Sequence, residues 1–430
     1  MTIEKKPLRE RYLLWKSMTR LTIGWRLRTL QARKAHVVSG HPKRLVIIPS
    51  DPWTLTGAKG DEAMMQAVVG QLSNQGQPLE VGVVTATAPA SAAAKKLGFI
   101  PIEIWDAGFS ATIDAIEQFD PDALVLLGAD CMDGYYSPHT TLRLLATADI
   151  SARQGVRASL LGFSFNESPS PYLKFPFNNL TPTLAINVRD NISLKRFNNF
   201  CEAPAQLVTD SAFMLKACVD SASVKDMAQW VESRRATGDT VVAFNIHPML
   251  LKDRTEEALA KINASAISAL RRLMTERPVS VVLLSHDYRG ADGDDTCLRV
   301  IHQALTADFP ESLRYTTEPL SAAELKAMAG LLDGVITGRM HLAIASLGMG
   351  VPVAALTYQD KFQGLMDHFE LPHSLLLSPA KVANPQELYA LLIAFTEQLQ
   401  ELRQKVASFL PSVLAASQLN VKPLVSASRK

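Results

Sequence analysis

The chain has 430 residues, of which 47% are apolar and 20% charged, and its formal net charge is +2. These proportions are typical of a soluble globular protein, and the length favours two or three domains. No apolar run reaches the roughly 18 to 20 residues that cross a bilayer, and no apolar block near the N-terminus predicts export. The sequence therefore predicts a cytoplasmic protein.

Positive charge is concentrated at the start of the chain. Residues 1–44 hold twelve Lys and Arg against two acidic residues, which leaves 32 basic and 40 acidic residues elsewhere. Because the basic character is local, no nucleic-acid partner is expected. The four cysteines are scattered without a CxxC pair, so neither a disulfide framework nor a metal site is predicted.

Residues 8–35 are predicted to form a basic amphipathic helix. Leu14, Met18, Leu21 and Trp25 recur at helical spacing, and eight Lys and Arg residues surround this stripe. Such a helix can lie on an anionic membrane surface, which would place the protein peripherally on the inner face of the plasma membrane. It can equally pack on the protein body or on a second subunit, and the pattern leaves both interpretations open.

From residue 44 onward, apolar runs of strand length alternate with helical stretches. The predicted strands are residues 45–49, 81–84, 102–105, 123–127, 158–163, 185–188, 241–246, 279–285, 313–316, 334–337 and 351–356. The predicted helices include residues 61–71, 256–275, 294–305, 322–332, 341–347, 362–369 and 385–409, whereas residues 166–182 are expected to form a loop. Asp292, Asp294 and Asp295 are interpreted as helix capping rather than a calcium loop.

This alternation predicts an α/β protein with two doubly wound, Rossmann-like domains facing a cleft, an architecture of the GT-B kind. The expected divisions are a helical extension (1–43), an N-terminal domain (44–217), a linker (218–239), a C-terminal domain (240–383) and a C-terminal helix and tail (384–430). Polar composition marks the linker.

The segment Thr337-Gly338-Arg339-Met340-His341 carries the clearest chemical signal. A strand ends there and a helix begins, which favours binding of an anion. Arg339 offers a planar fork for phosphate or carboxylate, and His341 titrates near neutral pH. Lys361 follows the next strand, so we expect it at the same carboxyl edge of a parallel sheet. His247 and His286 also end strands, and ligand contact or an ordinary polar strand end are both open for them.

Five pieces of the chain, in order, resemble the polysaccharide pyruvyl transferase family, over roughly residues 45–375. They are Gly60-Asp61-Glu62-Ala63, residues 122–128, Val188-Arg189-Asp190 with Ser193, Arg339-Met340-His341, and Val351-Pro352 with Tyr358 to Lys361. The turn after residue 127 departs from the family, because Gly128-Ala129-Asp130-Cys131 replaces consecutive glycines.

The resemblance implies transfer of the enolpyruvyl group of phosphoenolpyruvate to sugar hydroxyls, which gives a pyruvate ketal of a surface polysaccharide. It implies phosphoenolpyruvate as the donor substrate, no further cofactor, and a saccharide acceptor that could be lipid-linked. Arg189, Arg339 and Lys361 would bind the donor, His341 would be the general acid, and Asp61 would accept the hydroxyl proton or orient the sugar. A salt bridge for Arg189 and a helix-capping role for Asp61 are the structural alternatives.

Two other functions fit the same pattern. One is a glycosyltransferase of the GT-B fold that uses a sugar nucleotide. The other is a non-catalytic scaffold on the membrane periphery, which the Ala129-Asp130 departure motivates.

Overall fold

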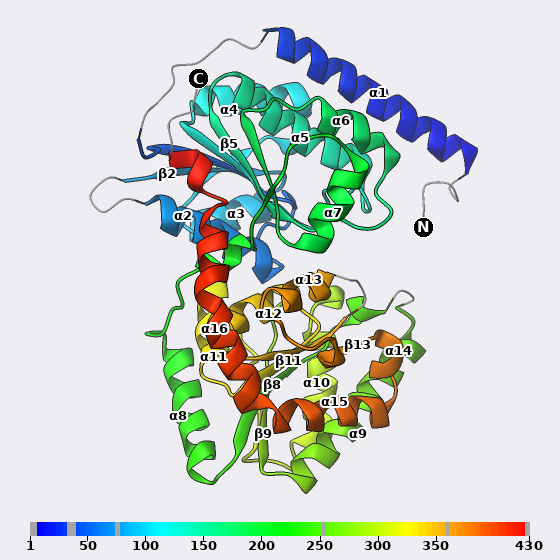
Figure 1. Cartoon of the computed structure of the whole chain (residues 1–430), viewed down its shortest axis with the longest axis vertical. Helices are drawn as coiled ribbons and strands as arrows, with labels where there is room; N and C mark the ends of the chain where they lie inside the picture. The colour runs from blue at the N-terminus through cyan, green and yellow to red at the C-terminus, as the bar shows by residue number, and fades with distance from the viewer. Residues whose placement is uncertain (1–6, 32–39, 74–77, 252–253, 358–360, 426–430) are drawn as a thin grey trace. The chain divides into compact units, whose positions relative to one another are not determined.

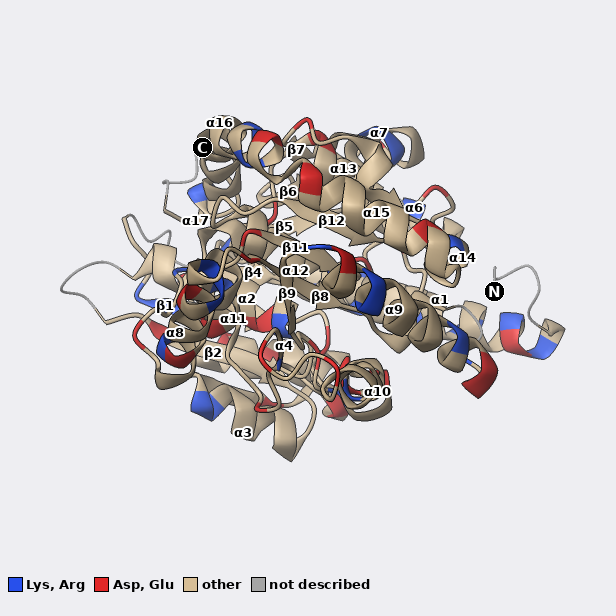
Figure 2. Cartoon of the chain, turned by 90° about the horizontal axis from the view of Figure 1, so that it is seen from below, with Lys and Arg blue, Asp and Glu red and all other residues tan. Residues whose placement is uncertain are grey.

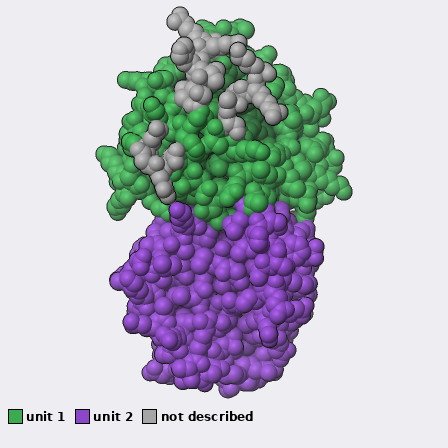
Figure 3. Space-filling view, turned by 60° about the vertical axis from the view of Figure 1, so that its left-hand side comes forward, with its two compact units in different colours: residues 1–56, 64–214, 415–430 green, residues 57–63, 215–414 purple. Residues whose placement is uncertain are grey.

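The computed structural model describes most of the chain, in two compact units (Figure 3). The described residues are 7–31, 40–73, 78–251, 254–357 and 361–425. Unit 1 comprises residues 1–56, 64–214 and 415–430, and unit 2 comprises residues 57–63 and 215–414. The end of the predicted first helix (32–35), the motif residues 358–360 and the tail from 426 lie outside the described residues.

Unit 1 is built on a seven-stranded parallel sheet in the order β3-β2-β1-β4-β5-β6-β7 (Figure 1). Its strands are β1 (Arg44–Ile48), β2 (Glu80–Thr85), β3 (Ile100–Glu103), β4 (Ala123–Leu126), β5 (Arg157–Phe163), β6 (Leu184–Val188) and β7 (Gln206–Leu207). Its helices are α1 (Leu8–Gln31), α2 (Lys59–Leu72, whose first turn belongs to unit 2), α3 (Ala88–Lys96), α4 (Phe109–Phe119), α5 (Pro138–Arg153), α6 (Lys174–Asn178), α7 (Asn191–Phe200) and α17 (Lys422–Val425).

Unit 2 is built on a six-stranded parallel sheet in the order β10-β9-β8-β11-β12-β13. Its strands are β8 (Thr240–Asn245), β9 (Val279–Leu283), β10 (Leu313–Tyr315), β11 (Gly334–Thr337), β12 (Val353–Leu356) and β13 (Leu376–Leu377). Its helices are α8 (Ala222–Ala236), α9 (Glu256–Glu276), α10 (Asp295–Leu305), α11 (Ala322–Gly330), α12 (Met340–Leu347), α13 (Lys361–Asp367), α14 (Pro379–Val382), α15 (Pro385–Glu397) and α16 (Leu399–Gln418), the last of which runs on into unit 1.

Both sheets reverse their strand order once. In unit 1 the chain builds outward from β1 to β3 and then restarts on the other side with β4, and in unit 2 β8 and β11 flank the same kind of reversal. Right-handed crossovers then place helices on both faces of each sheet, so the central strands are buried on both sides. Every residue of β4, β11 and β12 is buried. The predicted α/β class with two doubly wound, Rossmann-like domains is confirmed.

Three segments differ in detail from the sequence-based expectation. The polar stretch 218–239 contains α8, which buries only Val224, Met227 and Val231 and belongs to unit 2. The expected single helix 385–409 is two helices, because α15 ends at Glu397 and α16 starts at Leu399. The expected loop 166–182 includes the short helix α6.

Candidate functional site

The segments that follow β8, β9, β11 and β12 lie together at the carboxyl edge of the unit 2 sheet. Ligands of doubly wound proteins bind at this edge, where the strand order reverses. The reversal lies between β8 and β11, whose paired residues run from Gly334 with Val242 to Thr337 with Asn245. His247 follows β8 and Gly338 follows β11, and the His247 Nε2 lies 3.0 Å from the Gly338 carbonyl oxygen. The segments that follow β8 and β11 are therefore in direct contact at the point where the strand order reverses.

Arg339 is held by two buried carboxylates of the segment that follows β9. Its Nε and Nη2 lie 2.7 Å from Asp294 Oδ1, its Nη1 lies 3.0 Å from Asp287 Oδ2, and its Nη2 also donates to the Asp292 carbonyl at 2.9 Å. Only 11% of the side chain is exposed. Most of its N–H groups are thus engaged within unit 2. Its predicted contact with a substrate anion stays a prediction.

Asp294 is the residue of this edge whose role the sequence did not indicate. It lies at the start of α10 without capping it, because its carboxylate instead accepts from Asn245 Nδ2 at 2.7 Å and from the His286 backbone N–H at 2.7 Å. Burial raises the pKa of Asp294, and the Arg339 charge opposes that rise. Through Asn245 and Thr337, whose hydroxyl donates to the Asn245 amide oxygen at 3.0 Å, this carboxylate connects the ends of β8, β9 and β11. Its position fixes that of Arg339.

His341 stands on the first turn of α12 and is partly buried. Gly60 packs directly against its ring, since a Cβ on that glycine would lie 2.3 Å from His341 Nδ1. Any side chain at position 60 would therefore displace the imidazole. Asp61 follows Gly60 on the same turn, so both residues predicted to be catalytic belong to unit 2.

The first turn of α2 is attached to this edge by several contacts. Ala58 forms an isolated bridge with Asp287, and the Tyr288 backbone N–H donates to the Gly57 carbonyl at 3.3 Å. The buried Glu62 accepts from Lys59 Nζ at 2.7 Å and from the backbone N–H of Ala322, the first residue of α11, at 2.8 Å. Asp61 lies inside this first turn rather than before it. The N-cap position of α2 is residue 58, so Asp61 lies three residues too late in the sequence to be the capping residue.

Two further histidines of the edge are buried and held neutral. Burial and the nearby Arg339 charge keep the pKa of His247 well below its ordinary value. Burial and the charges of His341, Arg339 and Lys59 do the same for the pKa of His286. The charges that act on these two rings are positive, and two of their sources, Arg339 and Lys59, are themselves paired with carboxylates of the same unit.

Lys361 and Arg189 lie in different units. Lys361 begins α13 after β12, is half-buried, and is one of the positive charges that lower the pKa of His247. Arg189 follows β6 in unit 1, where its guanidinium pairs with Asp210 at 3.1 Å and donates to the Ser164 hydroxyl. Unit 2 thus contains four of the five predicted site residues, Asp61, Arg339, His341 and Lys361. The fifth, Arg189, lies in unit 1 and forms an ion pair there.

The corresponding edge of unit 1 has a different character. Gly128 follows β4, and a Cβ there would lie 1.9 Å from the Leu161 carbonyl oxygen, so the close approach of β5 requires glycine. Asp133 is buried, accepts from the Tyr135 backbone N–H at 2.7 Å, and has a pKa that burial raises to about 6. Tyr136 donates to Asp130 at 3.3 Å. Acidic and hydroxyl groups dominate here.

Among the described residues there is no group of three or more His, Cys, Asp and Glu side chains placed to hold a metal ion. None of the described helices combines the length and apolar character needed to cross a membrane.

Comparison with known proteins identifies the family. The family model for polysaccharide pyruvyl transferase matches residues 59–360, which is most of the chain. The chain belongs to the polysaccharide pyruvyl transferase family. The match begins in the first turn of α2 and ends just before Lys361, so it spans Asp61, Arg189, Arg339 and His341.

One curated relative and many solved structures are similar to the chain. The amylovoran biosynthesis protein AmsJ of Erwinia amylovora is 20% identical over 308 residues, which is 68% of this chain and 69% of AmsJ. A putative UDP-N-acetylglucosamine 2-epimerase from Listeria monocytogenes has a TM-score of 0.55 at 14% identity, over 87% of this chain and 94% of that one. A UDP-glucosyltransferase from Polygonum tinctorium has a TM-score of 0.57 at 9% identity, over 90% of this chain and 99% of that one. These structures show that the fold is GT-B-like.

Proposed function

We propose that this family member transfers the enolpyruvyl group of phosphoenolpyruvate to two hydroxyls of a saccharide, forming a pyruvate ketal in polysaccharide biosynthesis. The observation that carries the proposal is the set of basic and proton-bearing side chains at the carboxyl edge of unit 2. Lys59, Arg339, His341 and Lys361 supply charge or protons there, next to two histidines that are held neutral. Phosphoenolpyruvate carries a phosphate and a carboxylate, and such an edge offers several cationic partners for them.

The chemistry requires a proton at the methylene carbon of the donor. His341, as the imidazolium, gives this proton, which turns the double bond into a methyl group and leaves an oxocarbenium-like centre at the next carbon. A sugar hydroxyl attacks that centre and loses its proton to a base, for which Asp61 is the candidate. Departure of phosphate regenerates the cationic centre, the second hydroxyl closes the ketal, and its proton leaves with the phosphate. One donor and one diol thus give one ketal and one inorganic phosphate.

The position of His341 suits this role because its ring is fixed rather than free to rotate. Gly60 lies against the ring, and His341 itself belongs to the first turn of α12. A rigidly held proton donor contributes roughly 10² to 10⁴ in rate. Arg339, itself fixed by Asp294, provides a stationary positive charge beside the donor anion.

The acceptor is proposed to be a saccharide on a lipid carrier, with the protein working at the inner face of the plasma membrane. The name of AmsJ places that relative in the biosynthesis of a polysaccharide, amylovoran. Lipid carriers would present such an acceptor at a membrane surface, and α1 carries the basic side chains that an anionic surface attracts.

Turnover and binding test the proposal together. The full chain with phosphoenolpyruvate and a panel of acceptor diols should release phosphate and form a product that yields pyruvate after mild acid. His341→Asn should lose at least about 100-fold of this rate. The matched control is His373→Asn, which removes a half-exposed histidine of the same unit. A contrary result would be stabilisation by sugar nucleotides with neither turnover nor thermal stabilisation by phosphoenolpyruvate, which is the outcome expected of a glycosyltransferase.

A further inference from the structure

Helix α1 has two apolar faces, and only one of them is used within unit 1. Met18, Leu21 and Trp25 are buried on the inward face, and Trp25 Nε1 donates to the buried Asp149 at 2.7 Å. Arg28 pairs with Asp114 of α4 at 2.7 Å. The apolar stripe that is most evident in the sequence is therefore the one that packs on the body, so it is not free to meet a membrane.

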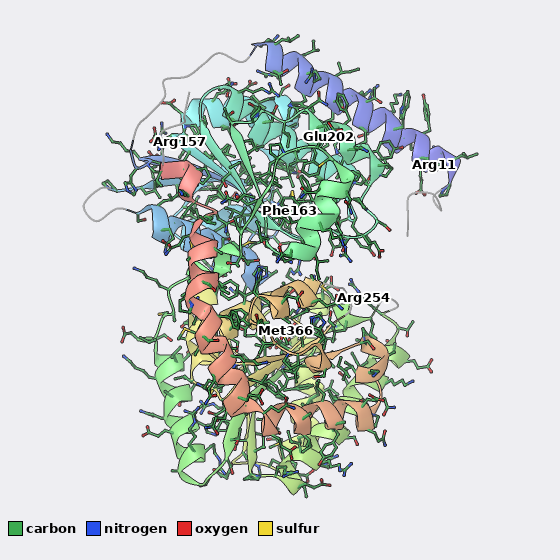
Figure 4. All side chains as sticks on the ribbon, viewed as in Figure 1. Arg11, Arg157, Phe163, Glu202, Arg254 and Met366 are labelled. Atoms are coloured by element: carbon green, nitrogen blue, oxygen red, sulfur yellow. The ribbon has the colours of Figure 1, made fainter. Side chains whose placement is uncertain are left out.

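The outward face of α1 carries a second apolar stripe. At 100° per residue its members fall within an arc of about 120°, on the side of the helix opposite Met18, Leu21 and Trp25. The stripe consists of Leu8, Tyr12, Trp15, Ile23, Leu27 and Leu30, each between 53% and 84% exposed. With Leu13, this one helix holds seven of the fifteen exposed large apolar residues among the described residues. Figure 4 shows side chains projecting from α1 on the side away from the sheet.

Basic side chains border the stripe on both sides. By helical spacing Arg9, Lys16 and Arg20 lie along one border, and Arg11 and Arg26 along the other. The ion pairs found among the described residues include Arg28 but none of these five, and Glu10 is the sole acidic residue of α1 (Figure 2). An exposed apolar stripe between two basic borders is the composition of a helix that lies in a membrane interface.

A pocket of about 700 Å³ adjoins the first basic border, and it is lined by α1, the start of α4 and the start of α5. Lys16, Arg20, His139 and Arg143 line it, and its lining contains no acidic residue. Burial and, second to it, the Arg143 charge lower the pKa of His139. The pocket thus extends the basic border inward from the helix surface.

We propose that the outward face of α1 is a docking surface for anionic lipid bilayers. The stripe enters the boundary between headgroups and acyl chains, with Tyr12 and Trp15 at headgroup depth and the basic borders on lipid phosphates. A second copy of the chain fits this face poorly, because two-fold pairing would bring basic borders together with few acidic residues to neutralise them. This inference deepens the membrane location proposed above, yet it is independent of the reaction.

Vesicle binding by the full chain tests the proposal. We expect co-sedimentation with vesicles containing phosphatidylglycerol as about a third of the lipid, and little with pure phosphatidylcholine. Trp15→Glu combined with Leu27→Glu should abolish binding. Lys16→Glu combined with Arg20→Glu should weaken it at least tenfold, since each basic side chain contributes about fivefold. Val300→Glu, which changes an exposed apolar residue of α10, is the matched control and should bind like the wild type.

Two further measurements separate the outcomes. Trp15 fluorescence should be quenched by lipids brominated near the headgroup, and the quenching should diminish in Trp15→Phe. Turnover of a soluble acceptor should be unchanged in Trp15→Glu, so failure of docking and failure of the reaction are distinguishable. Equal binding of all variants would overturn the proposal. So would a wild-type dimer that Trp15→Glu with Leu27→Glu makes monomeric, if vesicles bind neither form.

Discussion

The two units share one fold, but the edges at which their strand orders reverse carry different side chains. In unit 1 the segment after β4 presents Asp130 and the buried Asp133, and Arg189 is neutralised by Asp210. In unit 2 the corresponding edge holds two neutral histidines beside Arg339, which is itself paired with Asp294 and Asp287. A parallel sheet therefore supplies the place for a ligand, and the loop residues decide its charge.

The largest expected effect comes from removing the charge at the centre of the unit 2 edge. Arg339→Ala leaves the buried Asp294 without its ion-pair partner, whereas Asp287 keeps its pair with Arg289, and we expect a loss of about 3–5 kcal/mol in the free energy of unfolding together with loss of activity. Urea titration measures the first effect. Arg299→Ala, which breaks an exposed pair with Asp295, should cost less than about 1 kcal/mol. Similar losses for both variants would contradict the assigned role of Arg339.

The next test moves the imidazole of His341 without replacing the residue. Gly60→Ala places a methyl group against His341, and we expect the rate to fall by about 100-fold, since displacements of about 1 Å can cost that much. Gly70→Ala is the control in the same helix, because a Cβ there has no neighbour within 4 Å. It should keep full activity and gain up to about 1 kcal/mol of stability. Equal rates for the two variants would separate His341 from the reaction.

In unit 1 the buried Asp133 should make stability fall as pH rises. The folded pKa is raised to about 6, so the folded chain binds the proton more tightly than the unfolded chain, and this contribution is lost as pH rises through about 6. Asp133→Asn removes the titration. Its free energy of unfolding relative to the wild type should therefore increase by up to about 3 kcal/mol from pH 4 to pH 7. A pH-independent difference between the two chains would argue against this effect.

In unit 2 the buried His286 should make stability rise as pH rises, which is the opposite of the effect of Asp133. Because burial depresses the pKa of His286, its contribution is complete above about pH 6.5 and is lost as pH falls below that value. His286→Asn should show a smaller decline in stability from pH 7.5 to pH 5.5 than the wild type. If His286→Asn lost stability as steeply as the wild type, the ring would not be the group responsible.

The strands and the cationic edge of unit 2 were largely predictable, because apolar runs mark buried strands and the residues after them share one edge. Arg339, His341 and Lys361 could be placed in one domain on that basis. The attachment of the first turn of α2 to unit 2 could not be predicted, because the bridge between Ala58 and Asp287 joins residues more than 200 positions apart in the sequence. Asp294 gave only a capping signal, because nothing local shows that its carboxylate faces Arg339.

The N-terminal helix shows a similar limit. Periodicity indicated its apolar stripe correctly, but could not tell whether that stripe faces lipid or protein. Trp25 and its bond to Asp149 settle this for the inward face. The weaker outward stripe becomes visible only when exposure is known. The helix α8 was missed for the opposite reason, since three buried residues among fifteen give too little apolar signal.

The return of residues 415–425 to unit 1 has a consequence for synthesis on the ribosome. Asn420 accepts from the Gly162 backbone N–H and donates to the Thr209 carbonyl, each at 2.8 Å, and its own carbonyl accepts from Ser159 at 2.8 Å. Until residue 420 has emerged, these groups at β5 lack their native partner while the whole of unit 2 is being made. Although all seven strands of unit 1 are translated first, unit 1 must therefore wait for unit 2 before its last contacts can form, and a chaperone would have its longest opportunity to act during that interval.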